Sequence, residues 1–212
     1  SELVEAARAL SAATLHEAAE RTGVLPTAIK PLRNDWRLAG PVFTVQCPPG
    51  DNLWLHRAIY AARPGDVLLV NCSGGEDYGY WGEVMATAAI ARGLAGLVID
   101  GGVRDSELLR AMPFPVFASR ISIRGTIKDF GARGWLGAPT MFGSLAVESG
   151  DLLFGDADGV VVIPRARASD VIRASVEREA KEAELMTRLR SGRSTLALMG
   201  WAEDARWLGV QD

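Results

Sequence analysis

The sequence predicts an α/β fold in which a single domain is built on a mixed sheet. Strand-like and helix-like segments alternate through the middle of the chain, and two apolar strands around a turn follow later. The 212 residues are 48% hydrophobic and 23% charged, which suits a globular domain with a sizeable core. No linker divides residues 1–212, so we expect one domain.

In the N-terminal part, hydrophobic periodicity and turn residues mark the expected elements. Thr14-Leu-His-Glu17 fits a capping box and predicts a helix from Thr14, which Gly23 and Pro26 end. The helix over 51–62 should bury its apolar side chains, namely Leu53, Trp54, Ile59 and Tyr60. The other expected elements are a helix over 2–10, a loop over 27–40, and strands over 42–46 and 67–70.

The second half continues the alternation and ends in a long helix. The expected elements are a Gly-rich loop over 73–80, a helix over 84–92, a strand over 94–99, a loop over 100–105, a short helix over 107–111, a strand over 116–118 and short strands between 122 and 145. A hairpin over 150–163 turns at Asp156-Ala-Asp-Gly159, which lacks the later ligands of a calcium loop. The long helix spans 166–190, pairs Glu177 with Lys181 and stops at Gly192.

Trp81-Gly-Glu83 and Val103-Arg-Asp105 flank one helix and one strand of this pattern. A helix followed by a strand brings the two ends of the segment together, so Glu83, Arg104 and Asp105 should surround one small space. One guanidinium and two carboxylates can hold a divalent cation and an anionic substrate together. The sequence therefore predicts a binding site here.

Each of these two motifs also has a simpler, purely structural interpretation. The loop before Glu83 leads to a helix N-terminus, where the amides of Val84 and Met85 can bind a carboxylate or phosphate, but it can also be a plain flexible loop. Arg104 suits a carboxylate and Asp105 a hard cation, but the two can also form a surface ion pair. Only the combination of both motifs favours a site.

Composition narrows the classes of partner. The net charge is −3 and no basic run is present, so we expect no nucleic-acid surface; Arg188, Arg190 and Arg193 read as a solvated helix end rather than phosphate contacts. No apolar run approaches about 18 residues, so we expect no membrane span. Cys47 and Cys72 read as free core thiols, and we expect a cytoplasmic protein.

The two histidines and the acids of the last helix carry weaker signals. His16 and His56 share no ligand spacing, and we expect both to be structural. The acids of the last helix form a charged face that is ordinarily solvated, although in an oligomer one of them could reach a neighbouring subunit's site. They are Glu177, Glu179, Glu182 and Glu184.

Taken together, several segments resemble the divalent-metal-dependent pyruvate aldolases that act on 4-hydroxy-4-methyl-2-oxoglutarate and 4-carboxy-4-hydroxy-2-oxoadipate. That family includes the structurally similar regulator of ribonuclease activity A. The resemblance covers nearly the whole chain. The segments that carry it are Ala13-Thr-Leu-His-Glu-Ala18, Pro49-Gly-Asp-Asn52, Gly79-Tyr-Trp-Gly-Glu83, Ala86-Thr-Ala-Ala, Ala91-Arg-Gly93, Leu97-Val-Ile-Asp-Gly-Gly-Val-Arg-Asp105, Phe114-Pro-Val116, Lys128, Asp156-Ala-Asp-Gly, Arg178-Glu179 and Leu189-Arg-Ser-Gly192.

The resemblance implies a fold, an assembly and a set of site residues. The fold would be a swivelling β/β/α-type domain with a long C-terminal helix, assembled as a homotrimer or homohexamer with active sites between subunits. Asp105 would ligate Mg²⁺ or Mn²⁺, and Glu179 would approach the metal from the neighbouring subunit. The 2-oxo acid would be bound by Gly82, Val84, Met85 and Arg104.

Two positions depart from the family pattern. The family has Asp where this chain has Glu83, and it often has an acid where this chain has Leu108. The longer Glu83 side chain could displace a metal-bound water, or it could act through water as the base that removes the substrate hydroxyl proton. We expect Glu83 to act as the base, with Arg104 as its catalytic partner.

The implied activity is a lyase reaction of aromatic compound catabolism. A 4-hydroxy-2-oxo dicarboxylic or tricarboxylic acid would be cleaved to pyruvate and a second oxo acid. Oxaloacetate decarboxylation would be a side activity, because both reactions form the same enolate. The alternative is a non-catalytic regulatory protein that inhibits a ribonuclease-type partner. A methyltransferase reading finds no motif for a methyl-donor nucleotide.

Overall fold

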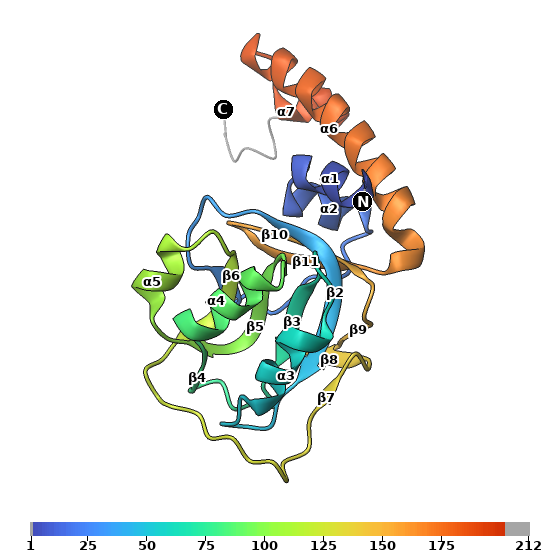
Figure 1. Cartoon of the computed structure of the whole chain (residues 1–212). Helices are drawn as coiled ribbons and strands as arrows, with labels where there is room; N and C mark the ends of the chain where they lie inside the picture. Colours follow the sequence, from blue (N-terminus) through green and yellow to red (C-terminus); the bar gives the residue numbers. More distant parts are fainter. Residues whose placement is uncertain (1, 202–212) are drawn as a thin grey trace.

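The computed structural model describes residues 2–201 and is organised around a large mixed sheet (Figure 1). Its strand order is β1-β6-β5-β3-β2-β10-β11, with β4 beside β5 and β7 beside β2. The strands are β1 Lys30–Pro31, β2 Leu38–Gln46, β3 Val67–Asn71, β4 Gly79–Trp81, β5 Gly96–Val103, β6 Val116–Ile121, β7 Trp135–Leu136, β10 Leu152–Asp156 and β11 Gly159–Ile163. A separate pair joins β8 Thr140–Phe142 and β9 Leu145–Val147.

Parallel pairing in the centre of the sheet explains the apolar runs of the sequence. The strands β2, β3, β5 and β6 are parallel neighbours, and parallel strands covered on both faces are apolar throughout. In β3, all four residues from Val67 to Val70 are buried. The sheet is nearly closed, because β1 lies beside β11 and Lys30 Nζ donates a hydrogen bond to the Asp158 carbonyl.

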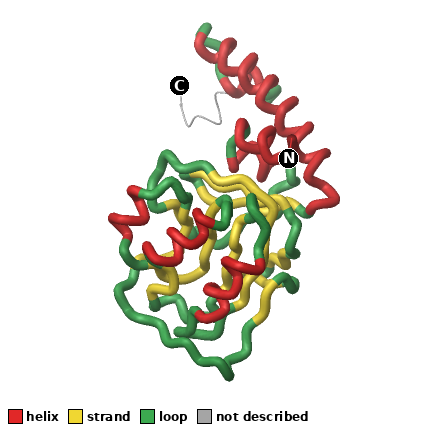
Figure 2. The backbone as a smooth tube through the Cα atoms, in the orientation of Figure 1, coloured by secondary structure: helices red, strands yellow, loops and turns green. Residues whose placement is uncertain are grey.

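The helices form two groups (Figures 1 and 2). One group, α3 Leu53–Ala61, α4 Glu83–Ala91 and α5 Ser106–Ala111, packs beside the parallel strands, where Trp81 stacks on Phe114 with ring centroids 5.9 Å apart. The other group packs with β10 and β11 around a second core cluster. Its members are α1 Glu2–Ala9, α2 Ala12–Ala18 and α6 Ala168–Arg190, to which a 3₁₀ turn at Arg165–Arg167 leads; α7 Thr195–Leu198 follows.

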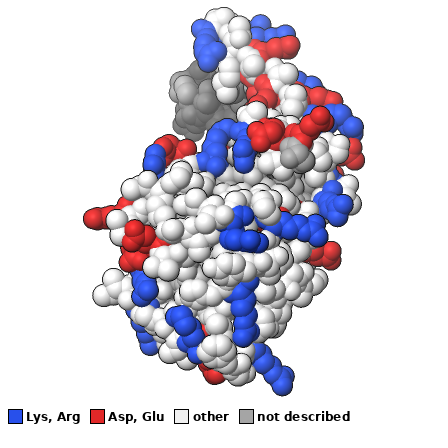
Figure 3. All heavy atoms as spheres, in the orientation of Figure 1, with Lys and Arg blue, Asp and Glu red and all other residues white. Residues whose placement is uncertain are grey.

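The later turns of α6 extend away from the body of the molecule (Figure 1). Its buried residues all lie between Ala168 and Ser175, and charged side chains of both signs surround the exposed part (Figure 3). None of the helices in residues 2–201 is both long and apolar enough to cross a membrane.

Most expected elements are present, including the hairpin of β10 and β11 and the long helix. The capping box is wrong, because α2 begins earlier and Ser11 is its N-cap, accepting the Thr14 amide at 3.0 Å. The expected loop over 27–40 is wrong in part, since it contains β1 and the start of β2. Tyr60 is exposed rather than buried. The described part of α6 pairs Arg178 with Glu182 at 2.8 Å and forms no ion pair between Glu177 and Lys181.

Candidate functional site

Parallel pairing of β4 with β5 brings the two predicted motifs side by side. Gly79 is paired with Gly102 and Trp81 with Val103, and the Arg104 amide donates to the Trp81 carbonyl at 2.8 Å. Where the strands end, the Glu83 amide donates to Asp105 Oδ2 at 3.1 Å. The expected loop over 100–105 is wrong in part, because β5 continues to Val103 through the two glycines. The backbone thus joins the start of α4 to the end of β5.

Gly82 makes this close approach possible. A Cβ atom at this position would lie 2.4 Å from Asp105 Oδ2, which is closer than atoms can pack, and 3.2 Å from the Arg104 side chain, which is a tight contact. Asp105 itself has a left-handed backbone, with φ of 55° and ψ of 38°. Such a conformation is uncommon outside glycine and often occurs at functional sites, where the surrounding structure holds it in place.

A cavity of about 180 Å³ opens at this junction. Of the six residues predicted to bind substrate or metal, five line it, namely Gly82, Val84, Met85, Arg104 and Asp105. The amides of Val84 and Met85 lie in the first turn of α4, where backbone N–H groups have no acceptor within the helix. The cavity therefore combines an anion-binding helix end, a guanidinium and a carboxylate, and its size suits a small ligand.

Glu83 and Glu179 lie outside this cavity. Glu83 begins α4, but its side chain is exposed and does not line the cavity wall. Glu179 lies on α6, which packs against α1 and α2 at the other end of the molecule (Figure 1). Within one chain, the structure therefore does not bring Glu179 to Asp105, and a role for it requires a second subunit.

Sequence reasoning missed four further residues of the cavity wall, which are Asn52, His56, Tyr80 and Lys128. Asn52 and His56 come from the start of α3. Lys128 comes from the segment after β6, which Asp51 holds beside α3 by accepting the Asp129 amide at 2.6 Å. The segment Pro49-Gly-Asp-Asn52 and Lys128 carried the family resemblance, and this was the only signal for their place in the site.

Asn52 is buried and only partly satisfied. Its Nδ2 donates to the Tyr80 carbonyl at 2.9 Å and contacts Met85 Sδ at 3.5 Å. Its Oδ1 is buried and receives no hydrogen bond from the residues that the structure describes. Tyr80 is itself fixed, because its hydroxyl donates to the Gly75 carbonyl at 2.8 Å and accepts the Gly50 amide at 2.6 Å. An unsatisfied buried acceptor is costly, so Asn52 Oδ1 is a strong candidate for ligand contact.

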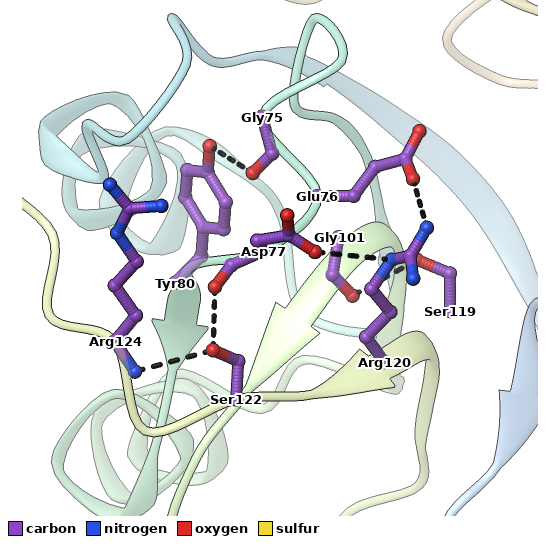
Figure 4. A network of polar contacts seen from close by, with 9 residues as sticks. All are labelled: Gly75, Glu76, Asp77, Tyr80, Gly101, Ser119, Arg120, Ser122 and Arg124. Atoms are coloured by element: carbon purple, nitrogen blue, oxygen red, sulfur yellow. Dashed lines mark hydrogen bonds and ion pairs between the residues drawn. The ribbon is translucent and has the colours of Figure 1, made fainter.

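Polar contacts hold the Gly-rich loop before β4 in a defined conformation (Figure 4). Arg120 donates to Glu76 at 2.6 Å and lies 3.8 Å from Asp77, and Ser122 Oγ donates to the Asp77 carbonyl at 2.5 Å. The Arg124 guanidinium lies 4.1 Å from the centroid of the Tyr78 ring. These contacts argue against the reading of residues 73–80 as a plain flexible loop, and they hold Tyr80 in place.

Burial shifts the pKa values of His56 and of the two cysteines in opposite directions. Burial, and then the positive charge of Lys128, lower the pKa of His56 below its ordinary value. Burial raises the pKa of Cys47 to about 12 and that of Cys72 well above its ordinary value, so both thiols are protonated at neutral pH. The cysteines therefore behave as core thiols, and His56 is neutral at pH 7.

The donor set of the cavity fits a hard divalent cation held partly by water. Among residues 2–201, no group of three or more His, Cys, Asp or Glu side chains comes together as a closed metal site. The cavity instead offers one carboxylate, that of Asp105, beside open space that water and substrate oxygens can fill. Mg²⁺ commonly binds through one or two carboxylates and otherwise through water and substrate oxygens, so an open site with a single carboxylate is compatible with it.

Comparison with known proteins identifies the family. The family model for RraA-like proteins, described as Aldolase/RraA, matches residues 3–162. The chain belongs to the aldolase/RraA family. A protein of Halalkalibacterium halodurans named "Putative 4-hydroxy-4-methyl-2-oxoglutarate aldolase" is 35% identical over 158 residues, which are 74% of each chain. The family match includes every residue of the cavity wall and ends before α6.

Solved structures of the same family share the fold. Streptomyces coelicolor RraAS2, described as an unusual member of the RNase ES inhibitor RraA protein family, has a TM-score of 0.74 at 27% identity, covering 89% of this chain and 98% of its own. The RNA-processing inhibitor RraA from Thermus thermophilis has a TM-score of 0.65 at 27% identity, covering 73% and 92%. The expected fold, that of the ribonuclease regulator with a long C-terminal helix, is confirmed.

Proposed function

We propose that this chain is a divalent-metal-dependent aldolase. It cleaves a 4-hydroxy-2-oxo dicarboxylic or tricarboxylic acid to pyruvate and a second oxo acid, and it decarboxylates oxaloacetate as a side activity. The observation that carries the proposal is the meeting of Arg104, Asp105 and the first turn of α4 in one small cavity. The name of the Halalkalibacterium relative supports the same reaction class.

The cavity groups suit the charge that forms in this reaction. Cleavage of the C3–C4 bond turns the substrate's 2-oxo end into the enolate of pyruvate, so negative charge develops on the C2 oxygen. Arg104 can bind that oxygen and the neighbouring carboxylate, and the amides of Val84 and Met85 can bind the carboxylate. Asp105, together with water and substrate oxygens, would hold Mg²⁺ or Mn²⁺, whose positive charge stabilises an enolate.

Assembly into a homotrimer or homohexamer is part of the proposal. Arg104 and Asp105 also face a second, open hollow whose wall includes the exposed side chains of Leu108, Ile121 and Ile123. Exposed apolar side chains grouped beside a polar site commonly mark an interface. A neighbouring subunit seated there would close the site, and Glu179 on its α6 is the group that we propose to reach the metal.

Pyruvate release tests this function. Wild-type protein should release pyruvate from members of a panel of 4-hydroxy-2-oxo acids with Mg²⁺ or Mn²⁺, and should decarboxylate oxaloacetate under the same conditions. Excess chelator should abolish both activities, and added metal should restore them. Full activity in chelator would remove the metal from the mechanism. Complete inactivity with every substrate and metal would favour the alternative, a regulatory protein that inhibits a ribonuclease-type partner.

A further inference from the structure

We propose that Asn52 and His56 form the wall of the cavity that recognises the C4 hydroxyl of the substrate, and that His56 takes the hydroxyl proton during cleavage. This inference rests on the proposed aldolase function and deepens it, because it assigns the base to His56 rather than to Glu83. Asn52 and His56 line the cavity together with Arg104 and Asp105.

Helix geometry places the two residues side by side. Asn52 is the N-cap of α3, and His56 follows it by four positions, so the two side chains lie on one face of the helix one turn apart. The His56 amide donates to the Asn52 carbonyl at 3.2 Å, which closes this first turn. Both side chains therefore belong to a single rigid wall.

The Asn52 amide is oriented so that its oxygen is the group left for a ligand. Its Nδ2 donates to the Tyr80 carbonyl, which can only accept, and this contact fixes which end of the amide is nitrogen. Asn52 Oδ1 therefore needs a donor. In an ionised 4-hydroxy-2-oxo acid, the carboxylates and the oxo group only accept hydrogen bonds, and the hydroxyl is the only donor. The unsatisfied Oδ1 consequently matches the hydroxyl.

His56 is suited to receive that proton. Its ring forms no hydrogen bond or ion pair within residues 2–201, and its low pKa leaves it neutral with one ring nitrogen able to accept. The positive charge of Lys128 raises the energy of the protonated ring. The other charged groups on the cavity wall are Arg104 and Asp105. The single hydroxyl proton is donated to Asn52 Oδ1 when the substrate binds and passes to the neighbouring His56 ring nitrogen when the C3–C4 bond breaks.

The proton and electron transfers balance around one histidine. The hydroxyl proton moves to the His56 ring as the C4–O bond becomes a carbonyl. The C3–C4 bond breaks, and its electron pair forms the enolate between C3 and C2. The protonated ring can then return the proton to C3 of the enolate, which yields pyruvate and regenerates neutral His56. Because burial, and then Lys128, lower the pKa of the ring, both favour this return.

Glu83 is less well placed for the same task. Its side chain is exposed and lies outside the cavity wall, and it would need a water molecule to reach the hydroxyl. His56 lines the wall itself. The two assignments predict different results for variants of the two residues, so one set of assays separates them.

The test compares cleavage with oxaloacetate decarboxylation, which needs no hydroxyl deprotonation. His56→Gln should lower kcat for cleavage by about 10²-fold or more while decarboxylation changes by only a few-fold. His16→Gln, which alters the half-buried histidine of α2 outside the cavity, is the matched control and should leave both activities unchanged. Circular dichroism and thermal melts confirm that each variant is folded. Asn52→Leu should raise KM for the hydroxy acid by about fivefold to tenfold without raising it for oxaloacetate.

A pH profile gives an independent readout on proteins with native folds. Cleavage by the wild type should fall as pH drops through a pKa below the ordinary 6.5 of histidine, and this acid limb should be absent from decarboxylation. Lys128→Met removes the positive charge, so the acid limb of whatever cleavage remains should move to higher pH.

Three outcomes would overturn the inference. They are equal loss of both activities in His56→Gln, selective loss of cleavage in Glu83→Gln with His56→Gln unimpaired, and an acid limb that Lys128→Met leaves in place. A wild type that cleaves no hydroxy acid would overturn the proposed function as well. The wild-type assay thus tests the proposed aldolase function. The ratio of cleavage to decarboxylation in the variants tests whether His56 is the base.

Discussion

The two ends of the molecule differ in how their polar side chains are buried and hydrogen-bonded. Around β4, β5 and the start of α3, polar groups are buried, interlocked and held by backbone contacts, as in the chain from Gly50 through Tyr80 to Asn52. Along the later turns of α6, the charged side chains are exposed or half-buried, and the ion pair among those of residues 2–201 joins Arg178 to Glu182. The difference shows which site residues this chain positions by itself and which need a partner.

Rigid placement at the first end depends on close backbone approach. Gly82 leaves room for Asp105, and the left-handed backbone at Asp105 aims its carboxylate toward the Glu83 amide. Within residues 2–201, Glu179 forms no such contact, and the ion pair beside it joins Arg178 to Glu182. The comparison therefore predicts large effects for changes at the cavity and effects that depend on assembly for changes on α6.

The largest effect is expected for Gly82→Ala. The new methyl group would meet Asp105 Oδ2 at 2.4 Å, so the carboxylate or the start of α4 must shift by close to 1 Å. A shift of that size can cost about 10²-fold in activity, and metal affinity should fall with it. Gly125→Ala is the control, because a methyl group there meets no atom within 4 Å. Steady-state kinetics and metal titration measure both changes. Equal kinetics for the two variants would show that the junction tolerates displacement.

Arg104→Lys should come next, with a loss of about 10²-fold in kcat for cleavage and for decarboxylation. Lysine keeps the positive charge but cannot bind two oxygens through a planar fork. The fold should survive, since the residue change leaves the β4–β5 backbone contacts in place. Arg173→Lys, at an exposed pair with Asp170, is the matched control. Near-normal turnover would place Arg104 outside the reacting centre.

Glu179→Gln tests whether α6 completes the site of a neighbouring subunit. The homo-oligomer should lose activity, and mixing these subunits with Gly82→Ala subunits should recover part of it, because some sites then combine an intact cavity with an intact α6. Ultracentrifugation should show a trimer or hexamer. An active monomer, or full activity in Glu179→Gln, would contradict the shared site and leave the cavity complete within one chain.

The smallest expected effect concerns the support behind the site. Tyr80→Phe removes a hydroxyl that donates to the Gly75 carbonyl and accepts the Gly50 amide, so the free energy of unfolding should fall by about 1–3 kcal/mol. Arg178→Ala removes an exposed pair and should cost less than about 1 kcal/mol. Urea denaturation compares the two. Equal losses would mean that the buried network stabilises the fold no more than a surface pair does.

The same contrast explains which site residues can be predicted from the sequence. Glu83 and Arg104-Asp105 stand at the two ends of one helix–strand segment, so local pattern alone predicts that they meet. The extension of β5 through Gly101 and Gly102 was not predicted, because adjacent glycines signal a loop, and only pairing with β4 and β6 makes them strand.

The remaining wall of the cavity depends on contacts between distant segments. Lys128 reaches α3 because Asp51 binds the Asp129 amide, a contact that spans 78 residues. No local periodicity encodes such a contact. The sequence likewise predicts a structural role for His56, and only the structure places it on the cavity wall.

Pyruvate formation from 4-hydroxy-4-methyl-2-oxoglutarate tests the central claim most directly. Wild-type protein, stripped of metal, should be inactive, should release pyruvate when Mg²⁺ or Mn²⁺ is added, and should lose about 10²-fold of that rate in Arg104→Lys. Pyruvate release that is unaffected by chelator and by Arg104→Lys would contradict the account, because neither the cation at Asp105 nor the guanidinium beside it would then be part of the reaction.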